Sequence, residues 1–450
     1  MTPMKIAIIG AGWAGMAAAV TATQVGHTAI IFEASQAIGG RARALKVMLP
    51  NGHEVMLDNG QHILIGAYTE TLKLMQAVGV DPQTALLSQP MALMFPDGRG
   101  LQFPDWPTPL DALAGILGAR GWSVADKASL LRVALGWQLQ GFKCDVSITV
   151  ATLGQRCSPR VMAELIEPLC VSALNTPAHR ASGQVFLRVM QDALFGVQGG
   201  SRLLLPRLDL SELFPSAAAR WMTQRGGQLH LGARVTALQP LGAQWQLERA
   251  DKADGEAGGE GEVFDAIILA TSSTESARML IGCAIEAPKN IAEKMQAWAA
   301  TAQNLAFEAI TTVYAWAPNA TLPHPMLALR SAEAGPGQVA CPAQFVFDRG
   351  QLGGPPGLLA FVTSASTGDR DTLQKQVLMQ AQTQLGLTLE AVQTVVEKRA
   401  TFACTPGLER PPAAIAPGLW ACGDYVAGPY PATLEGAVRS GVAAVQSLCQ

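Results

Sequence analysis

A glycine-rich turn between two apolar runs near the amino terminus constrains the fold more than any other feature. Lys5–Ile9 is a short, continuous apolar run, typical of a strand buried on both faces. It leads into the hexapeptide Gly10-Ala-Gly-Trp-Ala-Gly15, a helix-compatible stretch at 16–25, and a second strand at 28–32 that ends at Glu33. This order of strand, glycine turn, helix, strand and acid is typical of a dinucleotide-binding unit in an α/β fold.

The glycines and the acid each have a physical role in such a unit. Gly10 permits the tight turn, Gly12 lets the backbone approach a pyrophosphate, and Gly15 lets the helix pack closely on the strand. Free N–H groups and a partial positive charge at the helix N-terminus favour phosphate binding there. Glu33 is placed to accept hydrogen bonds from a ribose diol, and an acid there argues against an NADP 2′-phosphate. The predicted nucleotide-binding residues of this unit are Gly10, Gly12, Trp13, Ala14, Gly15, Glu33 and Ala34.

A second glycine pair, followed by two arginines, comes shortly after Glu33 in the run Gly39-Gly-Arg-Ala-Arg43. Backbone N–H groups and a guanidinium there can contact a second face of the same pyrophosphate. Together the two motifs resemble the signature GxGxxG…E…GGRxR of the flavin amine oxidase and phytoene desaturase superfamily. The resemblance implies a Rossmann-like FAD-binding domain similar to that of glutathione reductase, with Gly40, Arg41 and Arg43 among the residues that bind FAD.

The segment LDNGQHILIGAY at 57–68 narrows this resemblance. It looks like the corresponding segment of the hydroxysqualene dehydroxylases, the squalene-associated branch of the superfamily. The resemblance implies that Gly60, Gln61 and His62 lie near the flavin ring. His62 is the candidate catalytic acid or orienting residue, with an ordinary turn or core histidine as the alternative. Asp58 is expected to be structural and to bond the backbone of the turn.

The carboxy-terminal residues carry the second half of the predicted cofactor site. A short apolar strand at 419–422 ends in the pair Gly423-Asp424, whose aspartate in this superfamily bonds the ribityl or pyrophosphate part of FAD. A helix running to about residue 448 begins near Thr433 and Leu434, and its N-terminus would face the flavin edge that gains negative charge on reduction. By the same resemblance, the backbone at Val235 contacts the adenine.

Two long insertions separate these cofactor segments, so we expect an α/β protein with two interleaved domains. The second domain should be an α+β unit of mixed sheet and helices that binds substrate. The FAD-binding domain is predicted to comprise 1–90, 205–285 and 396–450, and the substrate-binding domain 91–204 and 286–395.

The insertions contain mostly apolar elements. Helices are expected at 110–117 and 125–139, and the second is apolar on more than one face. Such a helix covers a sheet or lies in a lipid interface, and both alternatives stay open. Further helices are expected to break at Pro159, Pro168 and Pro177. Strands and one helix are expected in the second insertion at 307–314, 343–347, 358–364 and 373–385.

Composition limits the partners of this chain. Of its 450 residues, 49% are hydrophobic and 15% charged, yet no uncharged run reaches the roughly 18–20 residues of a spanning helix. Since no signal-like segment is present, we expect a cytoplasmic protein, with peripheral contact to the inner face of the cell membrane left open. A net charge of −3 without a basic stripe argues against nucleic acid. Eight scattered cysteines predict neither disulfides nor a metal site.

The resemblance also implies a reaction, in which reduced FAD delivers hydride to an allylic carbon of hydroxysqualene while the hydroxyl leaves as water, giving squalene. The alternatives are a carotenoid desaturase of the phytoene type, a flavin amine oxidase, and a non-catalytic prenyl-binding escort protein. Only four tyrosines and no clear flavin-linking cysteine argue against the amine oxidase. No second dinucleotide fold is found, so the external electron donor stays unknown, as does the oligomeric state.

Overall fold

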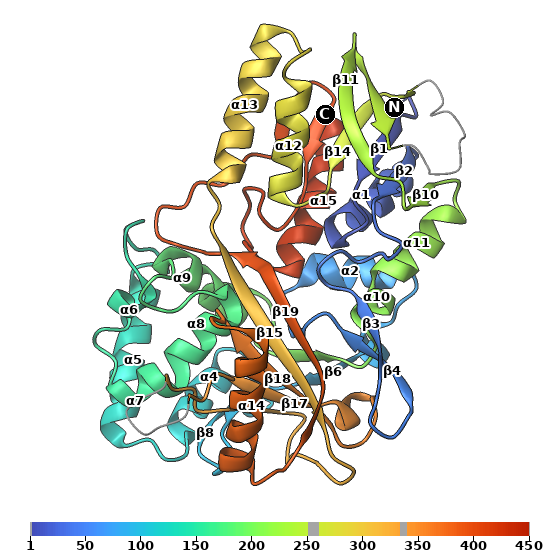
Figure 1. The fold of residues 1–450 in the computed structure, drawn as a ribbon. Helices are drawn as coiled ribbons and strands as arrows, with labels where there is room; N and C mark the ends of the chain where they lie inside the picture. Colours follow the sequence, from blue (N-terminus) through green and yellow to red (C-terminus); the bar gives the residue numbers. More distant parts are fainter. Residues whose placement is uncertain (1, 251–260, 334–339, 450) are drawn as a thin grey trace.

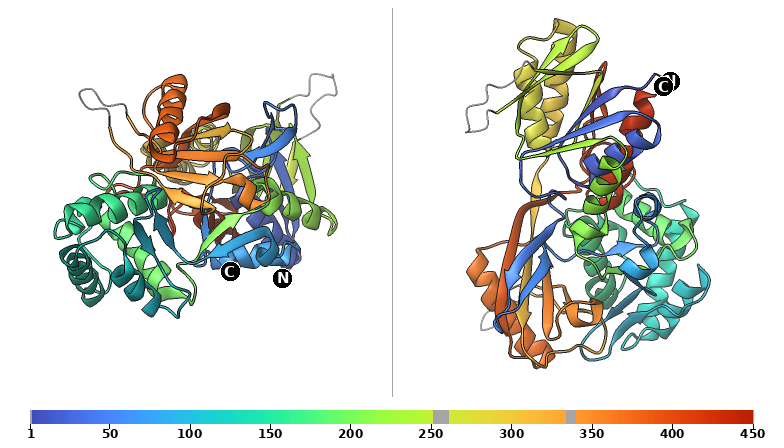
Figure 2. Two further views of the ribbon diagram at one scale, coloured as in Figure 1. Left: turned by 90° about the horizontal axis from the view of Figure 1, so that it is seen from below. Right: turned by 90° about the vertical axis from the view of Figure 1, so that its right-hand side faces the viewer.

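The computed structural model describes residues 2–250, 261–333 and 340–449 as two halves, with the dinucleotide-binding unit in the upper half of Figure 1. Figure 2 shows that both ends of the described chain lie close together in this upper half. The remainder, including the helices α4 to α9 and a second large sheet, forms the lower half.

The upper half is built on a six-stranded sheet in which β1 occupies the centre, as the buried apolar run predicts. Ile6, Ala7 and Ile8 have no exposed surface, because β1 has strand neighbours on both sides and helices or strands on both faces. Five strands are parallel, and only the edge strand β20 is antiparallel to its neighbour. The order is β10 (Gln228–Leu231), β2 (Thr28–Glu33), β1 (Lys5–Ile9), β14 (Ala266–Leu269), β21 (Leu419–Ala421) and β20 (Ala414–Ala416).

Helices cover one face of this sheet. The Ala-rich helix α1 (Trp13–Gln24) packs on it and is covered in turn by α15 (Leu434–Leu448) and α11 (Pro215–Thr223). A Cβ atom on Gly441 would lie 2.2 Å from the carbonyl oxygen of Ala14. The small residue at this position of α15 therefore permits close packing on α1.

An antiparallel ribbon and two helices cover the other face of the sheet. The ribbon comprises β11 (Val235–Leu241), β12 (Gln244–Arg249) and β13 (Glu262–Phe264). The Gly- and acid-rich sequence at 251–262 predicts a solvated hairpin loop between β12 and β13, and most of this segment lies outside the described residues. The helices are α12 (Ser273–Cys283) and α13 (Lys289–Gln303).

Helix α13 corrects one predicted domain boundary. It lies in the segment predicted to bind substrate, yet it packs against α12 in the upper half (Figure 1). Its Trp298 is buried and donates a hydrogen bond from Nε1 to the carbonyl oxygen of Pro412 at 2.7 Å. Because this buried face belongs to the cofactor half, the chain enters the substrate half only at β15, not at residue 286.

The lower half contains a five-stranded sheet with helix α14 (Arg370–Leu385) against it. The α/β fold class is confirmed, although every strand pair in this sheet is antiparallel, so the sheet is not mixed as predicted. Strands β15 and β19 run between the two halves (Figure 1), which places β19 across the predicted boundary at 395/396. The strand order is β16 (Met326–Ala328), β17 (Phe345–Asp348), β18 (Leu358–Ser364), β15 (Phe307–Trp316) and β19 (Glu390–Phe402).

Most helices of the lower half match the sequence, but the predicted break at Pro168 is wrong. The chain stays helical from Pro159 to Leu174, passing through a wide turn at Met162–Ile166 just before the proline. A proline near the start of a new α-helical segment needs no N–H partner, so the helix continues. These helices are α4 (Leu110–Gly118), α5 (Val124–Leu139), α6 (Val150–Leu153), α7 (Pro159–Val161), η1 (Met162–Ile166), α8 (Glu167–Leu174), α9 (Gly183–Gln191) and η2 (Asp192–Gly196).

Small strand pairs and short helices connect the two halves. The strands form a hairpin of β3 (Ala44–Met48) with β4 (Glu54–Asp58), a sheet of β5 (Leu64–Ile65), β9 (Leu203–Pro206) and β6 (Leu86–Gln89), and a pair of β7 (Ala92–Met94) with β8 (Gly100–Gln102). The helices are α2 (Thr69–Ala77), α3 (Pro82–Ala85), α10 (Leu210–Leu213) and the 3₁₀ helix η3 (Arg349–Leu352).

Candidate active site

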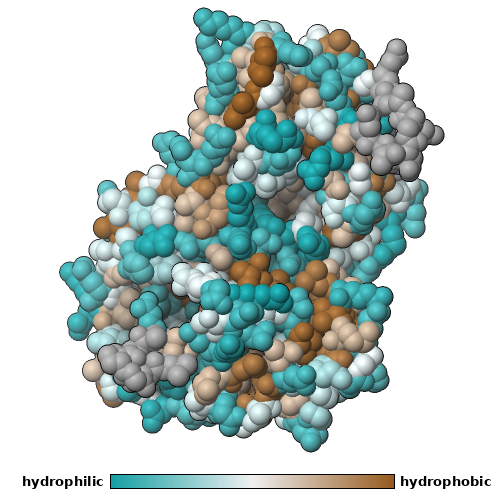
Figure 3. Space-filling model, in the orientation of Figure 1, coloured by the Kyte–Doolittle hydropathy of each residue, from teal (hydrophilic) through white to brown (hydrophobic). Residues whose placement is uncertain are grey.

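A cavity of about 520 Å³ is lined by residues from both halves of the molecule. Figure 3 shows polar side chains gathered around a recess between the halves, on the face where β15 and β19 cross. Nearly all residues predicted to bind the cofactor lie on its wall, although they come from widely separated parts of the chain. These are Gly10, Gly12, Trp13, Ala14, Glu33, Ala34, Gly40, Arg41, Gly60, Gln61, His62, Val235, Gly423, Asp424, Thr433 and Leu434.

Gly15 and Arg43 are the two predicted residues that do not line the cavity. A Cβ atom on Gly15 would lie 2.1 Å from the carbonyl oxygen of Gly10. Gly15 thus has the packing role predicted for it, holding α1 close to the end of β1. Arg43 donates a hydrogen bond from Nη1 to the carbonyl oxygen of Gly40 at 2.8 Å, so it stabilises the second glycine loop instead of the cavity wall.

The end of the cavity at the two glycine loops fits an ADP group. Gly10 has a φ of +111°, and a Cβ atom there would lie 2.7 Å from the carbonyl oxygen of Ala270, so only glycine fits the turn. Gly12 and Gly40 face each other closely, leaving the N-terminus of α1 without side chains in front of it. Glu33 accepts hydrogen bonds from the N–H groups of Ala11 and Ser35, each at 2.8 Å, which fixes the carboxylate on the cavity wall.

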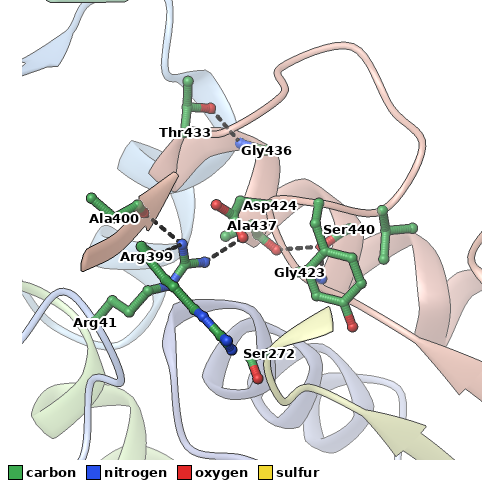
Figure 4. A network of polar contacts seen from close by, with 12 residues as sticks. Arg41, Ser272, Arg399, Ala400, Gly423, Asp424, Thr433, Gly436, Ala437 and Ser440 are labelled. Carbon is green, nitrogen blue, oxygen red and sulfur yellow. Dashed lines mark hydrogen bonds and ion pairs between the residues drawn. The ribbon is translucent and has the colours of Figure 1, made fainter. Parts of the chain in front are cut away.

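Arg41 and Asp424 form an ion pair that joins the two ends of the chain across the cavity (Figure 4). Nη2 of Arg41 lies 2.5 Å from Oδ1 of Asp424, and Nη1 donates to the carbonyl oxygen of Ala400 at 2.6 Å. Although burial alone would lower the pKa of Arg41, the negative charge of Asp424 raises it, so the guanidinium stays charged. The sequence predicted separate FAD contacts for these two residues and gave no sign that they pair.

The N-terminus of α15 is fixed beside this ion pair. Thr433 caps the helix by accepting a hydrogen bond at Oγ1 from the N–H of Gly436 at 2.9 Å. The N–H of Gly423 donates to Oγ of Ser440 at 2.8 Å, which ties the Gly-Asp pair to the same helix (Figure 4). The positive end of the α15 dipole therefore lies at the cavity wall, suited to a flavin edge that gains negative charge.

His62 is held as a neutral imidazole. Its Nδ1 lies 2.8 Å from the carbonyl oxygen of Gly60, and because a carbonyl can only accept, Nδ1 carries the proton. Burial lowers the pKa of His62, so the neutral form prevails at neutral pH and Nε2 carries no proton. This side chain lies on the cavity wall, and in its neutral form it accepts hydrogen bonds at Nε2. A role as catalytic acid stays a prediction.

Asp58 lies behind the wall and bonds the backbone. Its Oδ1 accepts a hydrogen bond from the N–H of Leu210 at 2.8 Å, and its carbonyl oxygen accepts one from the hydroxyl of Tyr314 at 3.0 Å. Burial raises the pKa of Asp58 to about 6. Asp58 thus bonds the backbone, as a structural role requires, but its partners are distant in sequence and do not belong to its own turn.

The part of the cavity in the lower half is largely apolar, and sequence reasoning missed its residues. They come mainly from the five-stranded sheet, where side chains two apart in a strand point to the same side. Phe345 and Phe347 on β17 show this spacing, but without knowledge of the sheet they were indistinguishable from core residues. The apolar wall comprises Ile63, Ile310, Phe345, Phe347, Val362 and Val395.

Asn175 closes this wall at the end of α8 and was also missed as a site residue. Its Oδ1 accepts a hydrogen bond from the N–H of Ala365 at 2.6 Å, and its Nδ2 donates to Oγ1 of Thr401 at 3.0 Å. The side chain thus ties α8 to β19 and to the residue after β18.

Within the described ranges, no group of three or more His, Cys, Asp or Glu side chains is arranged to hold a metal ion.

Comparisons with known proteins agree with this geometry. Residues 13–449 match the family model described as flavin containing amine oxidoreductase. The hydroxysqualene dehydroxylases of Rhodopseudomonas palustris and Zymomonas mobilis are each 25% identical to this chain over 96% of both chains. The 15-cis-phytoene desaturase of Synechococcus elongatus is 33% identical, but over only 25% of this chain and 24% of its own.

Solved structures share the whole architecture at low sequence identity. An oxidoreductase from Methanosarcina mazei superposes with a TM-score of 0.71 at 16% identity, covering 99% of this chain and 100% of that one. Cyclohexylamine oxidase from Brevibacterium oxydans gives a TM-score of 0.66 at 15% identity, covering 99% and 98%. With the family model matched from α1 to the last residue of the described chain, this protein belongs to the flavin-containing amine oxidoreductase family and is an FAD-dependent oxidoreductase.

Proposed function

We propose that this enzyme removes the hydroxyl group of hydroxysqualene by reduction, giving squalene. The observation that carries the proposal is the end-to-end match to hydroxysqualene dehydroxylases, which covers 96% of this chain, whereas the phytoene desaturase matches a quarter of it. FAD in its reduced form supplies hydride. Arg41, Glu33 and the two glycine loops would hold its ADP part, and Asp424 with the N-terminus of α15 would hold its flavin part.

The apolar wall supports an isoprenoid substrate. Phe345, Phe347 and Val362 offer no charge and no hydrogen-bonding group, so they favour a hydrocarbon chain over a polar amine. An allylic carbon that loses hydroxide gains positive charge, and an apolar enclosure keeps water away from that carbon. Tyr68 and Tyr425 also line the cavity. The hydroxyl of Tyr425 is already hydrogen bonded to Ser276, so it adds little polar character to the wall.

The test of this proposal is a single-turnover reaction without oxygen. The purified yellow protein is reduced with dithionite and mixed with hydroxysqualene, and we expect squalene in a 1:1 ratio to reoxidised flavin. A colourless protein that binds prenyl groups would favour the escort alternative. Conversion of phytoene by the oxidised enzyme, with no squalene from hydroxysqualene, would establish a desaturase instead.

We also propose that the protein is cytoplasmic and works against the inner face of the cell membrane. Exposed leucines recur on one side of α4 at 110, 113 and 117, next to exposed Trp106. An outward apolar stripe of this spacing with an aromatic residue at its edge is suited to a lipid interface. Leu135 and Leu139 are exposed one turn apart on the neighbouring helix α5. Within the described part of the chain, no helix is long and apolar enough to cross a membrane.

Flotation with liposomes of anionic lipid tests the membrane proposal. We expect the wild-type protein to float with the vesicles and the double variant Leu113→Glu/Leu117→Glu to stay in the soluble fraction. Ile285→Glu is the matched control, because Ile285 is 83% exposed but lies between α12 and α13 in the cofactor half. Equal flotation of all three proteins would contradict the proposal.

A further inference from the structure

We propose that Gln61, oriented by the buried Arg349, donates the hydrogen bond that stabilises the leaving hydroxyl oxygen of the substrate. This inference rests on the proposed function. It assigns a hydrogen-bond donor to the loss of the hydroxyl group. Its basis is the arrangement of donors and acceptors around the segment 60–62 at the junction of the two halves.

Arg349 is a buried cation directed at Gln61. Only 5% of Arg349 is exposed, and no acidic side chain lies within ion-pair distance of it among the described residues. Its Nη1 donates to Oε1 of Gln61 and to the carbonyl oxygen of Pro206, both at 3.3 Å. A buried charge is costly unless other groups compensate for it. The carboxyl of Asp58 interacts with Arg349 electrostatically but not at ion-pair distance, so the carboxamide of Gln61 and the carbonyl of Pro206 are its direct partners.

This contact determines which way the carboxamide of Gln61 points. An arginine has only donors, so the oxygen Oε1 must face Arg349 and the nitrogen Nε2 must face away. One N–H of Nε2 donates to the carbonyl oxygen of His62 at 3.2 Å. The other N–H has no hydrogen-bond partner among the described residues, and Gln61 lies on the cavity wall. The positive charge at Oε1 polarises the amide and strengthens Nε2 as a donor.

The neighbouring polar groups cannot take this role in their prevailing forms. The Nδ1–H of His62 is used by the carbonyl oxygen of Gly60, and its Nε2 carries no proton when the ring is neutral. The backbone N–H of Gln61 itself lies 3.4 Å from Oγ1 of Thr312, on the substrate sheet. Asp58 points its carboxylate at the N–H of Leu210, behind the wall. Gln61 is thus the side chain of this segment that lies on the cavity wall and keeps an N–H without a partner among the described residues.

The proposed step balances with one proton from solvent. The carbon–oxygen bond of hydroxysqualene would break, and a carbon–hydrogen bond would form with hydride that the anionic reduced flavin would supply. The carbon would be reduced by two electrons and the flavin oxidised by two. The leaving hydroxide would take up a proton from solvent and depart as water. Gln61 transfers no proton, because its hydrogen bond only stabilises negative charge on the departing oxygen.

The apolar surroundings increase the strength of this single hydrogen bond. The wall formed by Ile63, Phe345 and Phe347 offers the leaving oxygen no competing donor. In such an enclosure an electrostatic interaction is stronger than in water, and removing one donor of this kind lowers kcat by about 10²–10³-fold. We expect a loss of this size when the N–H of Gln61 is removed.

The test compares Gln61→Met, which keeps the length of the side chain but has no donor, with the wild-type enzyme. In anaerobic single turnovers with hydroxysqualene and FAD fully bound, we expect a rate about 10²-fold lower, together with a lower melting temperature because Arg349 loses one of its acceptors. Gln83→Met, at an exposed position of α3, should react at the wild-type rate. Arg349→Lys, which keeps the buried charge, should lose less activity than Arg349→Met.

Two further measurements complete the test. The first does not depend on turnover, and the second distinguishes Gln61 from His62 as the donor. The oxidised, unreactive enzyme should bind hydroxysqualene more tightly than squalene, as followed by the flavin absorbance, and Gln61→Met should lose this preference. The wild-type rate should stay constant between pH 7 and 9, since an amide does not titrate there, whereas an imidazolium acid at His62 would give a falling rate.

The outcomes separate this inference from the proposed function. If the wild-type enzyme forms squalene and Gln61→Met does so at the same rate, the inference is wrong and the proposed function stands. If the wild-type enzyme forms no squalene, both are overturned.

Discussion

At the scale of single residues, the cofactor end of the cavity is built from local sequence and the substrate end from residues that are distant in sequence. Gly10, Gly12 and Glu33 line the cavity together because they belong to one βαβ unit. The partners of Gln61 and Asp58 lie far away in sequence, at Arg349 and Leu210. Only the fold brings such residues together, so no local sequence pattern predicts these contacts.

Gly441 provides a test of close helix packing at the residue scale. Gly441→Ala would place a Cβ atom 2.2 Å from the carbonyl oxygen of Ala14, so α15 must move away from α1. We expect a loss of about 2 kcal/mol in the free energy of unfolding. The control is Gly282→Ala in α12, where nothing lies within 4 Å of the new atom. It should leave stability unchanged or raise it by about 1 kcal/mol. Equal effects of the two changes in urea denaturation would contradict the packing argument.

The buried carboxyl of Asp58 should make stability depend on pH. Since burial raises its pKa from 3.8 to about 6, the folded chain keeps a proton between these values that the unfolded chain has released. Stability therefore falls as pH rises from 4 to 6, and the cost stays constant above the folded pKa. Asp58→Asn removes the titration and can still accept from Leu210. We expect its stability relative to wild type to increase over this range by up to about 3 kcal/mol. Parallel stability curves in urea denaturation from pH 4.5 to 8 would exclude this account.

At the scale of elements, the predicted strands and helices agree closely with the structure wherever periodicity is strong. Strand β1 and strand β18 have the predicted ends, and α5 and α14 differ by a few residues. Strand β19 was missed, because its polar alternation matches no run of buried residues. The direction of the substrate sheet was also mispredicted, since parallel and antiparallel pairing depends on connections that the residue pattern does not encode.

Asn175 tests how one residue joins three elements. It has a left-handed backbone with φ of +45° at the end of α8, and its side chain reaches the residue after β18 and Thr401 on β19. Asn175→Ala should cost about 3 kcal/mol, from the lost hydrogen bonds and the strained backbone. Asn175→Gly keeps the backbone relaxed, so it should cost about 1 kcal/mol less. Urea denaturation measures both, and a glycine variant no more stable than the alanine variant would contradict the backbone part of this argument.

At the scale of the whole molecule, the cofactor site depends on contacts between the two ends of the chain. Helix α15 covers α1, and Asp424 pairs with Arg41. The sequence predicted that both ends bind FAD, but not that they bond to each other. That pairing depends on the three-dimensional closure of the sheet, in which β21 lies beside β14 and β14 beside β1.

The ion pair between Arg41 and Asp424 should contribute to FAD affinity. Asp424→Ala leaves the guanidinium of Arg41 without this carboxylate, while its hydrogen bond to the carbonyl oxygen of Ala400 remains. We expect the Kd for FAD, measured by fluorescence titration of the apoprotein, to rise about tenfold, equivalent to about 1.4 kcal/mol. The control Glu212→Ala breaks an exposed ion pair with Arg220 far from the cavity wall and should leave the Kd unchanged. An unchanged Kd in Asp424→Ala would show that the pair is not needed for FAD.

The closure of the upper half by its last helix also has a consequence for biosynthesis. A ribosome releases β1 and α1 early, yet α15 becomes available only after the whole substrate half has been made. Until then the apolar surface of α1, including Ala14 and Ala18, has no cover from α15 and is a binding surface for chaperones. We therefore expect a chain stalled before residue 434 not to retain FAD, and cofactor loading to follow the synthesis of α15.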